Sequence, residues 1–227
     1  MKENSLARGQ ELFNQKKYSD ALAFFLSLSS DSEEENLEIA YYLGLSYAKL
    51  SRYEDALVYL EQVVTSSEDN ERVLQCRFIL AVIYSVSGRK SLASFELEKL
   101  LEANYKSASV YAALAFISWE ESDIEKCLEY YEKALSENPD NLTALNGIGY
   151  VLACEEKDLT RALSCCKKAV DSSPNSAACL DSLGWVYYKL GLFDEAKKYI
   201  EKANAIDGSK VEIARHLRAV SLVGESA

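Results

Sequence analysis

Proline and glycine are scarce in this sequence. Its 227 residues include two prolines, Pro139 and Pro174, and nine glycines. A β-sandwich or barrel needs many tight turns, and these two residues are common in such turns. Hydrophobic residues make up 48% of the chain and charged residues 27%, which is typical of a folded globular protein and not of a disordered one. The composition therefore predicts a folded protein built from helices.

Basic residues are outnumbered by acidic ones. There are 25 lysines and arginines against 36 aspartates and glutamates, which gives a net charge of -11. Affinity for DNA or RNA comes largely from basic side chains that displace counterions from phosphates. We therefore expect no nucleic-acid partner.

Long apolar runs are also missing. No stretch approaches the roughly 18 apolar residues of a membrane-spanning helix, and the start, MKENSLARGQELF, has no apolar core such as a signal peptide requires. We expect no membrane insertion and a cytoplasmic location, unless a leader has been removed. The six cysteines are scattered without the CxxC or Cys/His spacing of a zinc site, which fits a reducing compartment.

Groups for catalysis are few. His216 is the only histidine, has no evident partner and is interpreted as a residue on the face of a helix. The neighbours Cys165 and Cys166 are interpreted as small buried hydrophobic residues. Gly147 and Gly149 form GIG, but no strand precedes them and no phosphate-binding lysine follows. The sequence predicts no enzyme, no catalytic residue, no cofactor and no metal site.

A repeat organises the chain. Six segments place a small residue three positions after a mostly aromatic or aliphatic one. The small residues are separated by 35, 37, 34, 35 and 34 positions, and they are Ala21, Ala56, Ala93, Cys127, Ala162 and Ala196. This period is typical of stacked helix–turn–helix units. Polar stretches at residues 29–36 and 65–71 are predicted to be turns between units.

The last unit, CLDSLGWVYYKLGLFDEAKKYIEKANAID from Cys179 on, closely resembles the tetratricopeptide repeat (TPR) family. Its signature positions are filled by Leu180, Leu183, Gly184, Tyr187, Ala196, Ile200 and Ala203. The resemblance covers about residues 2–208. It implies an all-α fold, a right-handed superhelical solenoid of about six TPR repeats in a single domain, residues 1–227. We expect repeats at about residues 2–35, 37–70, 74–107, 108–141, 142–176 and 177–208, and a capping helix at 209–223.

The resemblance also implies that the first helix of each pair lines a concave groove. The groove positions that we expect to bind a partner are Tyr41, Phe78, Phe116, Trp119, Tyr150, Asp181, Trp185 and Tyr188. Tyrosine and tryptophan make good anchors because they bury a large area with little loss of rotamer freedom. The alternative is that several of these aromatic residues pack between helices or under the capping helix.

These features favour a non-catalytic protein–protein interaction scaffold or adaptor. The expected partner is a peptide or an amphipathic helix that lies in the aromatic groove. Some family members grip chaperone C-termini with basic groove residues, but this chain has Gln75 and Ile79 where two of them would stand. The alternative function is a chaperone-like holder of an apolar client segment. Self-association through the groove or the ends of the array stays open.

Overall fold

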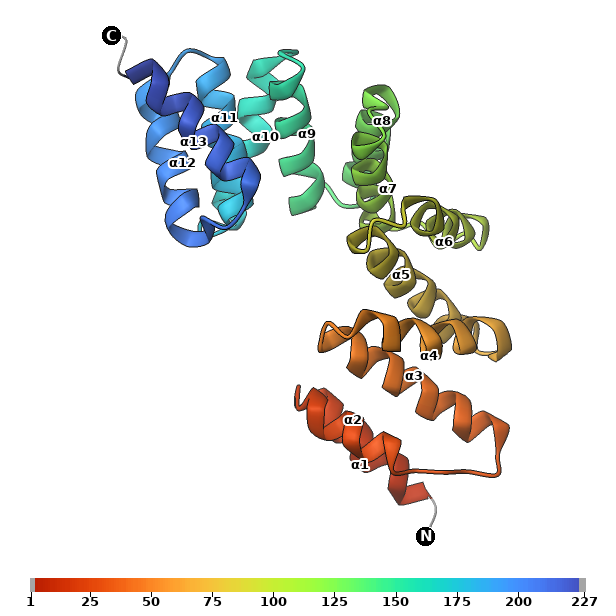
Figure 1. The fold of residues 1–227 in the computed structure, drawn as a ribbon. Coiled ribbons are helices and arrows are strands. Elements are labelled where there is room, and N and C mark those ends of the chain that lie inside the picture. Colours follow the sequence, from red (N-terminus) through yellow and green to blue (C-terminus); the bar gives the residue numbers. More distant parts are fainter. Residues whose placement is uncertain (1–2, 225–227) are drawn as a thin grey trace. The chain divides into compact units, whose positions relative to one another are not determined.

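The computed structural model describes residues 3–224, which form thirteen α-helices and no strand (Figure 1). The helices are α1 (Glu3–Asn14), α2 (Tyr18–Leu26), α3 (Glu33–Lys49), α4 (Tyr53–Ser66), α5 (Asn70–Val86), α6 (Lys90–Glu102), α7 (Ala108–Glu120), α8 (Ile124–Glu137), α9 (Leu142–Cys154), α10 (Leu159–Ser172), α11 (Ala177–Lys189), α12 (Phe193–Asp207) and α13 (Val211–Gly224). The predicted all-helical repeat fold is confirmed.

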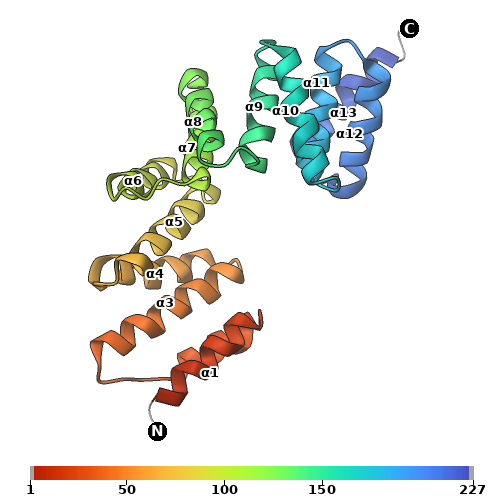
Figure 2. The same cartoon turned by 180° about the vertical axis from the view of Figure 1, so that it is seen from behind.

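The helices group into two compact units. The first unit ends at Tyr105 and contains α1 to α6, and the second begins at Lys106 and contains α7 to α13. Within the second unit, α9, α10, α11 and α12 stand in a row and alternate in direction (Figures 1 and 2). The capping helix α13 packs against α11 and α12. The single domain over residues 1–227 stays a prediction.

Side-chain caps define where the first helices of repeats two to six begin. Each of these helices is preceded by a residue whose side chain accepts a hydrogen bond from a backbone N–H of the first turn, and these residues are Ser32, Asp69, Ser107, Asn141 and Ser176. The shortest of these bonds runs from the Ala144 N–H to Asn141 Oδ1, at 2.9 Å. Such caps satisfy N–H groups that have no partner inside the helix.

The two polar stretches that were predicted to be turns are partly helical. Helix α3 begins at Glu33 and α5 at Asn70, four residues before the predicted repeats at 37 and 74. The cap residues Ser32 and Asp69 explain the difference, together with acidic residues in the first turn, which interact favourably with the helix dipole. The serine and acidic residues that suggested a loop therefore start a helix instead.

Small residues hold paired helices close together. All six small residues of the repeat are completely buried, from Ala21 to Ala196. A Cβ atom added at Gly184 would lie 2.5 Å from Ile200 Cγ1, and one added at Gly149 would lie 2.3 Å from Cys166 Sγ. Both distances are shorter than van der Waals contact, so a larger residue would push the two helices of the pair apart.

Every turn inside a repeat contains a residue in the left-handed region directly after the end of the first helix. The φ values of these residues lie between 53° and 74°, and the residues are Lys16, Ser51, Gly88, Ser122, Glu156 and Gly191. The turn between α9 and α10 contains a second such residue, Asp158, at φ 36°. After each of the first six residues the next N–H bonds a carbonyl near the helix end, as from Asp123 to Ser118 O at 2.9 Å. This is the Schellman ending, which usually employs glycine because a Cβ makes a positive φ unfavourable.

Replacing Ser122 with glycine is expected to raise the free energy of unfolding by about 0.5–1 kcal/mol, because glycine removes the strain of a positive φ. Urea denaturation followed by tryptophan fluorescence measures the change, since Trp119 and Trp185 are the only tryptophans and both lie in the second unit. The control Ser164→Gly, at an exposed helical position of α10, should lower stability. If both variants changed the free energy of unfolding in the same direction, the prediction would be refuted.

Candidate functional site

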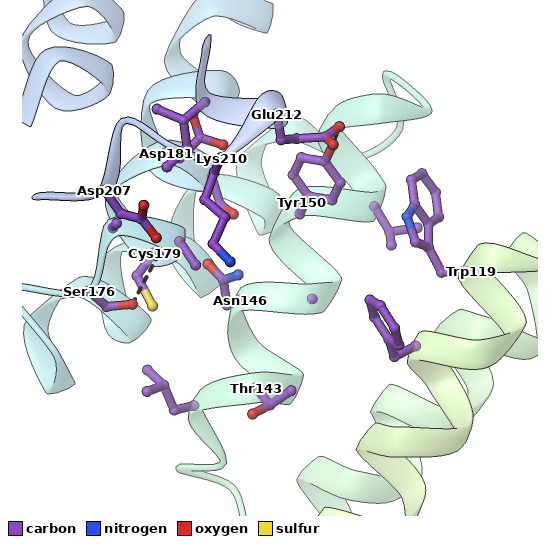
Figure 3. Close-up of a pocket in the computed structure, with 18 of the residues that line it drawn as sticks. Trp119, Thr143, Asn146, Tyr150, Ser176, Cys179, Asp181, Asp207, Lys210 and Glu212 are labelled. Atoms are coloured by element: carbon purple, nitrogen blue, oxygen red, sulfur yellow. Dashed lines mark hydrogen bonds between the residues drawn. The ribbon is translucent and has the colours of Figure 1, made fainter. Parts of the chain in front are cut away.

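The second unit contains a pocket of about 550 Å3 on the side of its first helices (Figure 3). Helices α7, α8, α9 and α11 supply most of its lining. The end of α12, the turn after it and the first residues of α13 also contribute, through Asp207, Lys210, Glu212 and Ile213. The volume lies within the range of about 300–1,000 Å3 that is usual for ligand pockets.

Aromatic rings form one side of this pocket. Phe116 and Trp119 are three residues apart on α7, so they share one helix face, and Phe116 is 45% exposed. The Trp119 ring meets the Tyr150 ring edge to face, with 5.8 Å between centroids and 77° between planes. Apolar surface on this side of the pocket is therefore partly exposed.

A hydrogen-bonded group connects α9 to the capping helix on the other side. The Tyr150 hydroxyl donates to Glu212 Oε1 at 2.8 Å, and Arg215 Nη2 donates to the same oxygen at 2.6 Å. Burial and the neighbouring Cys154 thiol raise the pKa of Tyr150 well above its usual value, and the bond to Glu212 raises it further. Tyr150 is therefore a neutral donor at physiological pH.

Asp181 and His216 form a buried pair between α11 and α13. His216 Nδ1 lies 2.9 Å from Asp181 Oδ2, and the His216 side chain is completely buried. The imidazole stacks on the Trp185 ring, with 4.1 Å between centroids and 15° between planes. The interpretation of His216 as a residue without a partner was wrong, because α13 folds back onto α11 and brings together residues 35 positions apart.

Two acceptor atoms near the pocket are buried without a hydrogen-bond partner among the described residues. They are Asp181 Oδ1 and Asn146 Oδ1. Both residues line the pocket, and Figure 3 shows the Lys210 side chain extending toward Asn146. Buried polar atoms usually have partners, so unpartnered atoms at a pocket wall indicate a place where a ligand group can bind.

The pocket brings together four of the six groove residues predicted in the second unit: Phe116, Trp119, Tyr150 and Asp181. The other two, Trp185 and Tyr188, stack on each other at 4.8 Å and are half-buried. Trp185 also packs under His216 of the capping helix. For Trp185 the structure thus follows the alternative in which a groove aromatic packs under that helix.

The two predicted residues of the first unit lie on first helices as well. Tyr41, on α3, is half-buried, and its hydroxyl donates to Gln75 Oε1 on α5. Burial raises the pKa of Tyr41 to about 12, and the Arg72 guanidinium lies 5.5 Å from its ring centroid. Phe78, on α5, is half-buried. Tyr41 is therefore held by its neighbours on α5.

Asp207, Lys210 and Glu212 were missed by the sequence prediction. Asp207 is the last residue of α12, Lys210 lies in the turn that follows, and Glu212 is in the first turn of the capping helix. A repeat pattern assigns groove positions only inside its units, so residues at the end of the array carry no signal in it. The signal that could have found them is the three charged residues within six positions at the end of the last repeat.

Burial disfavours the reactive form of two cysteines at neutral pH. Cys76 and Cys127 are completely buried, and burial raises the pKa of each thiol to about 12. The reactive form is the thiolate, so these thiols react slowly. Residues 3–224 contain no cluster of three or more His, Cys, Asp or Glu side chains that could hold a metal ion. Within the same range, no helix has the length and apolar character needed to span a bilayer.

Family comparison agrees with the geometry of the repeats. Two sequence models of the tetratricopeptide repeat match the chain, one at residues 6–71 and 117–177 and the other at residues 177–210. Together these matches span more than half of the sequence. The chain belongs to the tetratricopeptide repeat family. In the structure α1 to α12 form six consecutive helix pairs, and α13 follows the last of them.

Solved structures share this TPR fold. A crystal structure of the APC/C hetero-tetramer Cut9–Hcn1 matches 95% of this chain with a TM-score of 0.77 and 16% identity, and the match spans 42% of that chain. A tetratricopeptide repeat protein from Parabacteroides merdae matches 94% of this chain and 81% of its own, with a TM-score of 0.67 and 18% identity. At such low identities the likeness concerns the fold alone.

A third similar structure is that of YrrB, a TPR protein with an unusual peptide-binding site. It matches 81% of this TPR chain and 92% of its own, with a TM-score of 0.57 and 18% identity.

Proposed function

We propose that this TPR protein is a non-catalytic adaptor that holds a peptide or helix of a partner protein against the first helices of its repeats. The observation that supports the proposal most is the pocket of the second unit, where Phe116, Trp119 and Tyr150 stand beside unpartnered acceptor atoms. Exposed aromatic surface of this kind usually marks a binding site. YrrB, with its peptide-binding site, offers a precedent on the same fold.

The adaptor is favoured over a holder of long apolar segments by the polar side of the pocket. A holder would need a continuous apolar surface. In this pocket the apolar surface is not continuous, because the lining also contains the polar residues Asn146, Asp181, Lys210 and Glu212. A small number of polar groups at fixed places in an otherwise apolar pocket is typical of specific recognition. A defined segment therefore fits this site better than an extended apolar client.

Replacing Phe116 with glutamate tests the adaptor proposal. Partner recovery from native cells, quantified by mass spectrometry, should fall at least about tenfold, because a central aromatic anchor is lost and a charge is placed on apolar surface. Phe116 is 45% exposed, so the substitution should leave the fold intact, as circular dichroism can verify.

The matched control is Phe95→Glu on α6, where the phenylalanine is 48% exposed but lies on the second helix of its repeat. This control should recover partners as the wild type does. Equal recovery by the wild type and Phe116→Glu would refute the proposed site, and an equal loss in both variants would point to general apolar adhesion instead.

A further inference from the structure

We propose that the pocket of the second unit binds a basic side chain, arginine in preference to lysine, presented by the partner segment. The inference rests on the proposed adaptor function and specifies the chemistry of its partner. Three features of the pocket support it, namely the charge of its lining, an unpartnered buried carboxylate oxygen and an aromatic wall.

The charge of the lining is negative. Asp181, Asp207 and Glu212 line the pocket, and Lys210 is the one basic residue of the lining within the described part of the chain. The Ser209 hydroxyl donates to Asp207 Oδ1 at 2.6 Å and lowers the pKa of Asp207, and Lys210 lowers it further. Asp207 therefore keeps its charge at neutral pH, and a cationic guest is attracted while an acidic one is repelled.

Asp181 supplies a buried acceptor for the charged head of the guest. The residue is only 4% exposed, its Oδ2 is paired with His216, and its Oδ1 has no partner within residues 3–224. Hydrogen bonds between a carboxylate and a guanidinium or ammonium are among the strongest in proteins. Asp181 and Asn146 both line the pocket, so a side-chain shift at its wall would let a donor of the guest reach Asp181 Oδ1 and Asn146 Oδ1.

The aromatic side suits the stem of the same guest. A basic side chain combines an apolar stem with a charged head, and the pocket combines Phe116, Trp119 and Tyr150 with acidic residues of α11, α12 and α13. Arginine is favoured because its planar guanidinium stacks on aromatic rings and offers several donors. An apolar guest would leave Asp181 Oδ1 unpartnered, and a carboxylate would face Asp181, Asp207 and Glu212.

Two side chains of α13 that face the acidic residues already have partners. His216, on α13, is paired with Asp181, and Arg215 donates to Glu212. Lys210, at the start of the capping region, is exposed and extends toward Asn146 (Figure 3). Lys210 therefore competes with a basic guest, so its removal should strengthen binding.

A peptide series tests the inference directly. Short acetylated and amidated peptides, rich in leucine and alanine, differ only in a central arginine, lysine, glutamine or glutamate. Fluorescence anisotropy should give the order arginine, lysine, glutamine, glutamate, with arginine binding at least about tenfold more tightly than glutamine. The advantage of arginine should shrink as salt is raised.

Variants of the pocket-lining residues test whether these residues cause the preference for arginine. The double variant Asp207→Asn/Glu212→Gln should reduce the preference for arginine, whereas Lys210→Gln should increase affinity about two- to threefold. The matched control Glu195→Gln/Glu201→Gln changes the net charge by the same amount at exposed positions of α12 outside the lining, and it should bind as the wild type does.

Three outcomes overturn the inference. Equal affinity for the arginine and glutamine peptides would exclude a basic guest, and equal losses in the pocket and control variants would assign the preference to the overall charge. Binding of none of the peptides would also refute it. The adaptor function has its own test in partner recovery by Phe116→Glu, so its failure would be visible separately.

Discussion

Shortening Ile200 to alanine is expected to lower the free energy of unfolding by about 2–5 kcal/mol. Ile200 is completely buried on α12, where it forms a core cluster with Ala196 and Val220 and has Tyr187, Tyr188 and Leu217 packed around that cluster. The change removes buried methyl and methylene groups and leaves a cavity where α11, α12 and α13 meet, which the surrounding helices fill only in part.

Urea denaturation followed by tryptophan fluorescence measures this loss. The matched control is Ile206→Ala, which makes the same chemical change on the same helix at a side chain that is 50% exposed. We expect the control to cost less than about 1 kcal/mol, since little buried contact is lost. Similar losses at both positions would contradict the assigned packing of α12.

Replacing His216 with leucine should lower stability by about 3 kcal/mol. The variant removes the partner of Asp181 Oδ2 and leaves a buried aspartate with neither carboxylate oxygen paired. Breaking a buried polar pair on one side is strongly destabilising, because the remaining group keeps its desolvation cost without its partner. Chemical denaturation gives the size of the effect.

The double variant Asp181→Leu/His216→Leu distinguishes the loss of the buried pair from the loss of stacking on Trp185. When both partners become apolar no buried carboxylate remains, so most of the lost stability should return. A double variant that is as unstable as His216→Leu alone would show that the imidazole acts through its stacking on Trp185 and not through the pair. The difference between the variants thus measures the coupling of α11 to α13.

The spacing of small residues was sufficient to predict the helix pairs. Cys127 and the five alanines recur because two helices can cross closely only where side chains are short, and all six are completely buried in the structure. This requirement concerns residues close together in the sequence, so it can be recognised in a single sequence. The start of α3 at Glu33 was not predicted, because serine and acidic residues are common both in loops and in the first turn of a helix.

The turns inside the repeats were less visible in the sequence. All six contain a residue with positive φ, but only Gly88 and Gly191 are glycines, while a lysine, two serines and a glutamate fill the others. Helix packing on both sides of the turn imposes this geometry on residues that do not prefer it. Propensity alone therefore could not locate these four turns.

The candidate site was predicted in part. Phe116, Trp119, Tyr150 and Asp181 come together as their repeat positions indicated. Burial of Asp181 by His216 depends on how α13 folds back, and that contact joins residues far apart in sequence with no repeat to relate them. Long-range polar pairs of this kind leave no periodic signal, so they could not be predicted from a single sequence.

The solitary histidine also gives the chain a built-in spectroscopic reporter. Its imidazole lies face to face with the Trp185 indole at 4.1 Å, so the aromatic ring current should move its carbon-bound protons upfield in a proton NMR spectrum. No other histidine overlaps with that resonance, because the sequence contains only one. The position of one peak should therefore tell, without any label, whether the last helix is docked as temperature, denaturant or a bound partner changes.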